Sequence, residues 1–149
     1  PHLGTIEIRI MDAQTTVTDA VTVAAFVRLL VDFLRITRDQ DESVRPCRTL
    51  PWWAIKDNCF NASRKGIDAT VIANVSGETC TLRDTLQETV RAFTEHTQDG
   101  ELLSYATRLA TKIKHPAYQH QLDIGRQGSL PQVCRDLADS LSAESKSGI

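Results

Sequence analysis

Apolar and polar residues alternate strictly near the start of the chain. Isoleucines occupy every second position from residue 6 to residue 10, and polar residues lie between them, which is the period of a β-strand with one buried face. Glu7 and Arg9 then share the polar face, roughly 6–7 Å apart along the strand. This spacing suits a metal ligand beside an anion-binding arginine, but on alternation alone it is more typical of a weak surface ion pair on an antiparallel strand. We therefore predict an N-terminal antiparallel strand and keep both interpretations open.

The next segment has the period of an α-helix. Thr16 or Thr18 is a suitable N-cap for a helix that runs to about Arg38. Apolar residues at intervals of three and four predict its buried face, formed by Val23, Phe26, Val27, Leu30, Phe33 and Leu34. Residues 37–51 follow as a predicted surface loop, because they are rich in charge, include two prolines and show no periodicity.

A second helix is predicted over residues 54–63, with Gly66 as its C-cap. Residues at i, i+4 and i+7 form its polar face, with one more at the edge of that face: Asp57, Asn61, Arg64 and Asn58. Polar faces of this kind usually hold loops in place or contact solvent. Residues 67–72 are predicted to form a short strand or extended segment.

Three further helices are predicted in the second half of the chain. Two begin at capping boxes, Thr81-x-x-Asp84 and Ser129-x-x-Gln132, and the other lies between Asp99-Gly100 and Pro116. Their buried positions recur with the helical period: Leu82, Leu86, Val90 and Phe93; Leu102, Leu103, Ala106, Leu109 and Ile113; Leu130, Val133, Leu137 and Leu141. We expect these helices to pack around the outside of the sheet. The predicted fold class is α+β and mostly helical.

Composition is that of one soluble globular domain. The 149 residues are 41% hydrophobic and carry a net charge of −2, which argues against a nucleic-acid-binding arm and a basic membrane-binding patch. The longest apolar stretch, residues 21–34, is interrupted by Thr22, Arg28 and Asp32, so no transmembrane helix is predicted. The four cysteines contain no C-x-x-C pair, so we expect reduced thiols in a cytoplasmic protein. The sequence has neither a P-loop nor a G-x-G-x-x-G motif, and its four histidines are scattered, so no ATP-binding loop of that type and no zinc site is predicted.

Two ordered sequence blocks resemble one known enzyme family. The segment G-T-I-E-I-R-I-M-D at residues 4–12 is similar to the G-T-[VIL]-E-[VI]-R-[VI]-x-D signature of bacterial carboxylate–amine ligases, the second glutamate–cysteine ligase family. The segment D-N-C-F-N-A-S-R-K-G-I-D-A at residues 57–69 is similar to the family's E-N-x-[WF]-x-A-x-R-x-G-[LI]-[DE] block. The family is a distant relative of glutamine synthetase. Lys65 stands where an aromatic residue is common in this family.

The resemblance implies an ATP-dependent ligase that uses Mg²⁺. In that reaction a carboxylate, expected to be the γ-carboxylate of glutamate, forms an acyl phosphate, and an amine such as that of cysteine displaces phosphate. By its match to the signature, Glu7 is expected to be a metal ligand and Arg9 a catalytic residue that binds phosphate or substrate. Asn58 and Arg64 are expected to contact substrate or nucleotide. The N-terminal strand would then belong to a glutamine-synthetase-like catalytic sheet.

The resemblance also indicates what this chain lacks. Intact members are more than twice as long, and their first acidic metal-binding strand, G-x-E-x-E, does not occur here. We therefore expect residues 1–141 to be the C-terminal part of a ligase catalytic domain that is inactive alone, followed by a flexible tail at residues 142–149. At least one of Trp52 and Trp53 is expected to pack on the core or on the missing part.

Two other classes of function stay open from the sequence. The chain could be a catalytically inactive binding or regulatory module of the same fold, or a structural helical domain with an accidental likeness. The presence of both Glu7 and Arg9 favours the enzyme. Small-molecule substrates are the expected ligands, with neither nucleic acid nor membrane as a partner. An exposed N-terminal strand would offer an unpaired edge, so we also expect a homo-oligomer.

Overall fold

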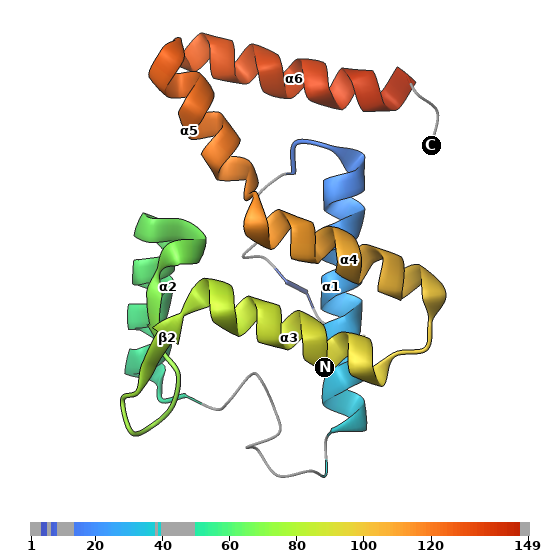
Figure 1. Cartoon of the computed structure of the whole chain (residues 1–149), viewed down its shortest axis with the longest axis vertical. Coiled ribbons are helices and arrows are strands. Elements are labelled where there is room, and N and C mark those ends of the chain that lie inside the picture. The colour runs from blue at the N-terminus through green and yellow to red at the C-terminus, as the bar shows by residue number, and fades with distance from the viewer. Residues whose placement is uncertain (1–3, 6, 9–13, 38, 40–49, 147–149) are drawn as a thin grey trace.

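A computed structural model describes residues 4–5, 7–8, 14–37, 39 and 50–146 of the chain. The elements are listed in order with their bounds: α1 (Val17–Ile36), α2 (Trp52–Lys65), a 3₁₀ turn (Gly66–Asp68), β1 (Thr70–Ile72), β2 (Thr79–Thr81), α3 (Leu82–His96), α4 (Gly100–Lys114), α5 (Ala117–Gln127) and α6 (Leu130–Lys146). The predicted α+β class with mostly helical content is confirmed (Figure 1). No described helix combines the length and the apolar character needed to cross a bilayer.

Three helices enclose the hydrophobic core. In Figure 1, α3 and α4 lie side by side and both cross α1. Phe93 of α3 is 1% exposed and lies at the centre of this packing. Its ring centroid is 5.3 Å from that of Phe33 and 5.6 Å from that of Phe26, both on α1. The core of the described part is thus built by helices packing on helices. That these helices pack around the outside of a catalytic sheet stays a prediction, because the sheet among the described residues is the β1–β2 pair.

Helix α1 begins and ends as its sequence predicts, but its buried face differs. The Thr16 side chain accepts a hydrogen bond from the Asp19 backbone N–H, as an N-cap should. The buried residues are Asp19, Thr22, Ala25, Leu29 and Phe33. Of the predicted stripe only Phe33 is fully buried, and Leu34 is exposed. Two polar residues can be buried because the Thr22 hydroxyl donates to the Thr18 carbonyl and Asp19 pairs with Lys112 of α4 at 2.7 Å.

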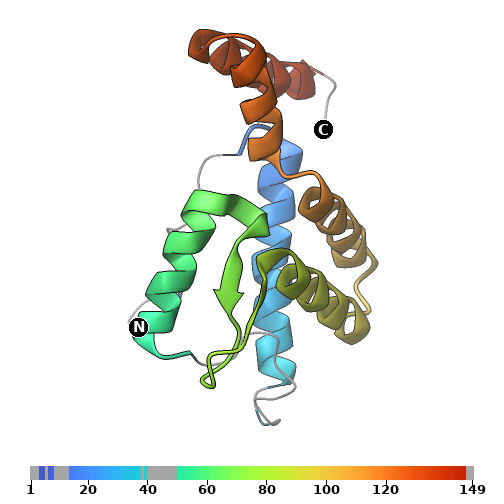
Figure 2. The same cartoon turned by 60° about the vertical axis from the view of Figure 1, so that its left-hand side comes forward.

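Helix α2 and the hairpin form the second part of the fold. Strands β1 and β2 pair antiparallel, with Val71 opposite Cys80. Figure 2 shows α2 lying along this hairpin at one side of the molecule. Gly66 has φ 61° and ends α2 as predicted. Ala54, which is fully buried, lies on the inner face of α2, and β1 is the element that α2 contacts most extensively.

The C-terminal helices depart from prediction in three ways. Helix α5 was not predicted, because its sequence lacks an apolar period. Helix α6 continues to Lys146, so residues 142–146, which were predicted to be a tail, are helical. Residues 147–149 lie outside the described residues. The predicted division of the chain at residue 142 is otherwise untested. None of the predicted buried positions of α6 is buried, because α6 packs mainly on α5, which itself has no buried residue.

The predicted N-terminal strand falls mostly outside the described residues. Thr5, Glu7 and Ile8 are described, and none of them is in a strand. Within the described part of the chain, β1 and β2 form a two-stranded sheet, so it supplies no further strand with which this segment pairs. Arg9 is not among the described residues.

Candidate functional site

Helix α2 carries two of the predicted site residues, and the structure places them on different faces. Asn58 faces the hairpin. Its side-chain Nδ2 donates to the Ile72 carbonyl at 2.9 Å, and its Oδ1 accepts from the Ile72 N–H at 2.7 Å. The amide thereby pairs with the backbone as a neighbouring strand would. Asn58 in this structure fixes the position of α2 on β1.

Replacing Asn58 by alanine should therefore destabilise the fold. Both backbone groups of Ile72 would lose their partner in a half-buried position, which we expect to lower the free energy of unfolding by about 1–3 kcal/mol. Urea denaturation of the isolated chain measures this. Asn61→Ala is the matched control. Among the described residues, the Asn61 amide bonds only to the exposed Asp57 carboxylate. An equal loss in both variants would contradict the positioning role.

The opposite side of α2 is an exposed surface of aromatic and cationic side chains. We call it the outer face of α2, formed by Trp52, Trp53, Lys56, Phe60 and Arg64. The three aromatic residues are 69%, 61% and 57% exposed in chain order. The Lys56 ammonium lies 4.7 Å from the Trp52 ring centroid, and the Arg64 guanidinium carbon lies 5.5 Å from that of Phe60. Each cation is thus held over a ring at i, i+4 spacing.

The outer face of α2 presents cationic groups of the kind that bind anions. A guanidinium that rests on an aromatic ring loses less rotational freedom on binding and offers paired N–H donors to a carboxylate or a phosphate. An ammonium at the other end of the same face adds a second positive charge. Sequence reasoning missed Lys56 and the surface role of Phe60, although the two aromatic–cation pairs at four-residue spacing were visible. Since both tryptophans are exposed, neither packs in the core of the described part; packing on a missing part stays a prediction.

The remaining predicted residues are less defined by the structure. Glu7 is exposed, and Arg9 lies outside the described residues. Among the described residues no three histidine, cysteine, aspartate or glutamate side chains gather as a metal site would require. Of the four cysteines, Cys59, Cys80 and Cys134 are described and carry free thiols.

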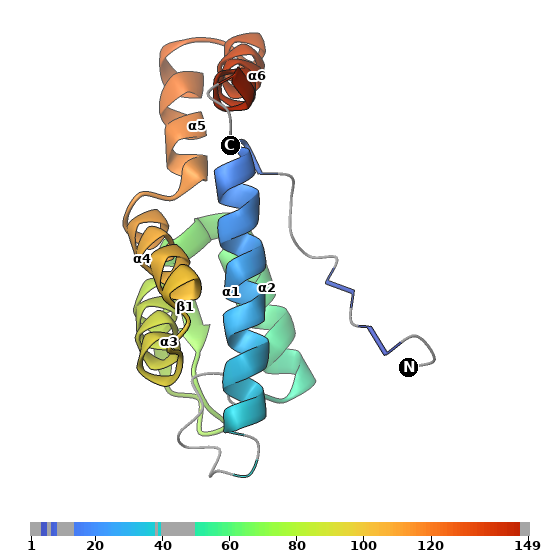
Figure 3. The same ribbon diagram turned by 90° about the vertical axis from the view of Figure 1, so that its right-hand side faces the viewer.

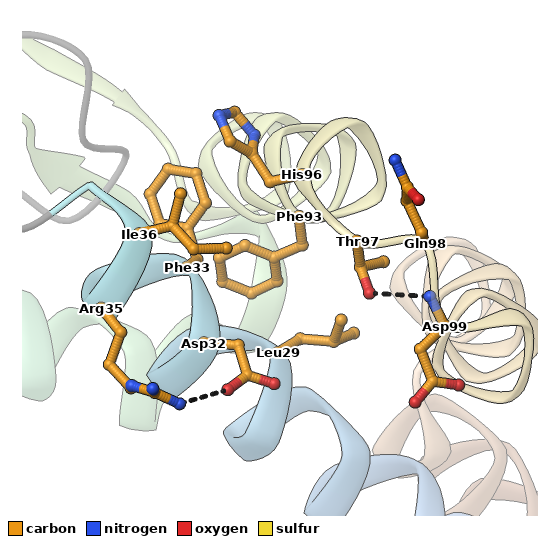
Figure 4. A pocket seen from close by; sticks show the side chains of 10 residues that line it. All are labelled: Leu29, Asp32, Phe33, Arg35, Ile36, Phe93, His96, Thr97, Gln98 and Asp99. Carbon is orange, nitrogen blue, oxygen red and sulfur yellow. Dashed lines mark hydrogen bonds and ion pairs between the residues drawn. The ribbon is translucent and has the colours of Figure 1, made fainter.

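A separate pocket lies where α1 and α3 end and α4 begins (Figure 4). Its volume is about 430 Å³, and Phe33 and Phe93 line it. Its two carboxylates have partners: Asp32 pairs with Arg35 at 3.6 Å, and the Asp99 carboxylate caps the start of α4. None of the predicted site residues is in the lining of this pocket, so the outer face of α2 is the better candidate for ligand binding.

Comparison with known proteins gives a match to one protein family. The family model described as glutamate–cysteine ligase family 2 matches residues 1–136, which include both sequence blocks and all of α2. No solved structure gives a significant match.

Named relatives agree with the family match. A protein of Trichormus variabilis is 30% identical over 97% of this chain, and one of Thermobifida fusca is 32% identical over 99%. A protein of Bdellovibrio bacteriovorus is 29% identical over 93%. All three bear the provisional name glutamate–cysteine ligase 2. The chain spans only 36–38% of their lengths.

Proposed function

Because the chain belongs to glutamate–cysteine ligase family 2, we propose that it is part of an ATP-dependent carboxylate–amine ligase. The observation that carries this proposal is the family match over residues 1–136, which spans both blocks found in the sequence. The outer face of α2 supports it, because the face presents Arg64, a residue of the second block, as an exposed cation.

The proposed reaction has two steps. An oxygen of the glutamate γ-carboxylate bonds to the γ-phosphorus of ATP, and the bond from that phosphorus to the β,γ-bridging oxygen breaks, which releases ADP. The cysteine amine then bonds to the acyl carbon, the carbon–oxygen bond to phosphate breaks, and the amine proton passes to water or to a group outside the described residues. The products are an amide, ADP and phosphate.

Both steps bring anions together, so they need fixed positive charge. We assign Arg64 to the binding of a substrate carboxylate or a nucleotide phosphate. Asn58 helps to position Arg64, since its amide anchors α2 to β1. Its contact with substrate or nucleotide stays a prediction. Arg9 keeps its proposed catalytic and binding role.

The proposal includes Mg²⁺ near Glu7. A carboxylate oxygen is the type of ligand that Mg²⁺ prefers, and the ion would neutralise phosphate charge when bound. Glu7 supplies one metal-ligating side chain, and no cluster of three candidate ligands occurs among the described residues. The fit is therefore partial, and the other ligands would come from outside the described residues. Assembly into a homo-oligomer and a cytoplasmic location stay predictions.

An assay of ADP release and amide formation tests the proposal. The chain and a longer protein that contains it are each supplied with ATP, Mg²⁺, glutamate and cysteine. We expect equal amounts of ADP and γ-glutamyl amide from the longer protein and neither from the chain alone, because it spans about a third of its relatives. If the longer protein makes no amide with any pair of acid and amine, the alternative of an inactive binding module replaces the ligase.

A further inference from the structure

Helices α5 and α6 form a helical hairpin, the α5–α6 hairpin, that lies mostly outside the hydrophobic core. Neither helix has a buried residue. The two helices pack on each other, with the Val133 side chain 3.7 Å from the position that a Cβ on Gly125 would occupy. Figure 3 shows the hairpin beyond the N-terminal end of α1. Tyr118, at the start of α5, packs against the core, and beyond this residue the two helices contribute no buried side chain.

At its base the hairpin is held by Tyr118 of α5. The Ile67 N–H donates to the Tyr118 hydroxyl at 3.3 Å. The Tyr118 ring also packs so closely on Gly66 that a Cβ at that residue would lie only 2.5 Å from a ring carbon and would clash with it. Gly66 has φ 61°, a conformation that favours glycine. This close contact fixes the start of α5 beside the end of α2, while Pro116 forms the connection to α4.

At its far end the hairpin is held by Glu144 of α6. The Glu144 carboxylate accepts hydrogen bonds from the Val17 N–H at 2.5 Å and from the Thr18 N–H at 3.1 Å, and also from the Thr18 hydroxyl. The first N–H groups of a helix have no acceptor within that helix, and the positive end of its dipole favours a carboxylate. Glu144 therefore caps α1 from a position 126 residues away in sequence.

We propose that the α5–α6 hairpin is a hinged arm and that Glu144 is the latch that closes it on α1. Segments held by a few polar contacts open at a lower free energy than segments that share the core. When the latch is closed it restrains Val17, which lies five residues after Asp12, the end of the first family block. This inference does not depend on the ligase reaction.

The charge state of Glu144 supports the latch. The hydrogen bond from the Thr18 hydroxyl is the main cause that holds the pKa of Glu144 below its ordinary value of 4.5, and the Val17 and Thr18 N–H groups act in the same direction. Asp19 of α1 opposes this, and Asp19 is itself paired with Lys112 of α4. Because the pKa of Glu144 is depressed in the folded state, the ionised carboxylate stabilises the closed arm at neutral pH. This stabilisation is lost as the pH falls through that pKa.

Amide hydrogen exchange measured by NMR tests the latch. In Glu144→Ala we expect the exchange of the Val17 and Thr18 amides to rise roughly tenfold, because two N–H groups lose a charged acceptor. The Asp19 amide should keep its protection, since its acceptor is Thr16. Asp139→Ala is the matched control, because it removes an exposed carboxylate from the same helix and should change neither amide.

A second measurement locates the opening. Limited proteolysis of Glu144→Ala should cut faster near residues 115–116 and 128–129, the connections on either side of α5. The amide of Phe93 should exchange as slowly as in the wild type, which shows that the core stays folded. Unchanged exchange of Val17 and Thr18 in Glu144→Ala, or the same increase in Asp139→Ala, would overturn the proposal.

Discussion

Arg64→Ala should reduce kcat/KM for amide formation by roughly 100-fold in the longer ligase, the scale expected when one charged group that stabilises developing negative charge is removed. Arg64 lies on the exposed side of α2, and its guanidinium is held over Phe60. Among the described residues, Arg64 makes this ring contact but no hydrogen bond or ion pair that would hold other parts of the fold in place. Its loss should therefore affect catalysis and leave stability within about 0.5 kcal/mol of the wild type.

Lys56→Ala is the matched control for this prediction. Lys56 is also a cation over an aromatic ring on the outer face of α2, but it does not belong to the second family block. Steady-state kinetics with varied ATP and varied glutamate should show a much smaller effect for Lys56→Ala. Arg64→Lys should restore only part of the activity, because an ammonium cannot offer paired donors. Equal effects of Arg64→Ala and Lys56→Ala would indicate general electrostatic attraction and not a specific role of Arg64.

Phe93→Ala should cause the largest loss of stability in this chain, about 3–5 kcal/mol. The ring is 1% exposed and contacts two other aromatic rings, so the substitution removes buried surface and leaves a cavity between α1 and α3. A loss of this size is a large part of the 5–15 kcal/mol that stabilises a typical domain. Urea denaturation followed by circular dichroism measures it.

Phe60→Ala provides the comparison, because Phe60 is the same residue type but 57% exposed on α2. We expect this variant to stay within about 0.5 kcal/mol of the wild type. If Phe60→Ala destabilised the chain as much as Phe93→Ala, the assignment of the core to the packing of α1, α3 and α4 would be wrong.

The sequence predicts helices well where capping and periodicity agree. The side chains of Thr16, Thr81 and Asp99 each accept a hydrogen bond from a backbone N–H at the start of a helix. In the sequence, each is a polar residue that precedes a run of apolar residues with helical spacing. The face that a helix buries is harder to predict. Helix α1 carries apolar residues on most of its sides, so periodicity alone could not show that Thr22, Ala25 and Leu29 turn inward.

Partners distant in sequence account for what could not be predicted. Leu130 is 80% exposed although it has the spacing of a core position, because periodicity identifies an apolar face and not the element that covers it. Strand β2 is three residues long and runs directly into α3, too short to show an alternating pattern. Its pairing depends on a turn in which Asn74 accepts from two backbone N–H groups.

The sequence indicated where to look for a candidate site. The second family block directed attention to Asn58 and Arg64, and the structure confirms the helix that carries both. That Asn58 and Arg64 lie on different faces of α2 could be inferred only once the position of the β1–β2 hairpin was known. Asn58 bonds to Ile72 of β1, fourteen residues away. The metal-binding role of Glu7 and the role of Arg9 rest on the resemblance, and both stay predictions.

The most direct test of the ligase proposal follows one oxygen atom. Glutamate labelled with ¹⁸O in its γ-carboxylate is supplied with ATP, Mg²⁺ and cysteine to the longer protein, and the released phosphate is examined by ³¹P NMR. If the carboxylate attacks the γ-phosphate, one labelled oxygen must appear in each phosphate that accompanies amide formation. Amide formed together with unlabelled phosphate would contradict an acyl-phosphate intermediate and with it the proposed mechanism.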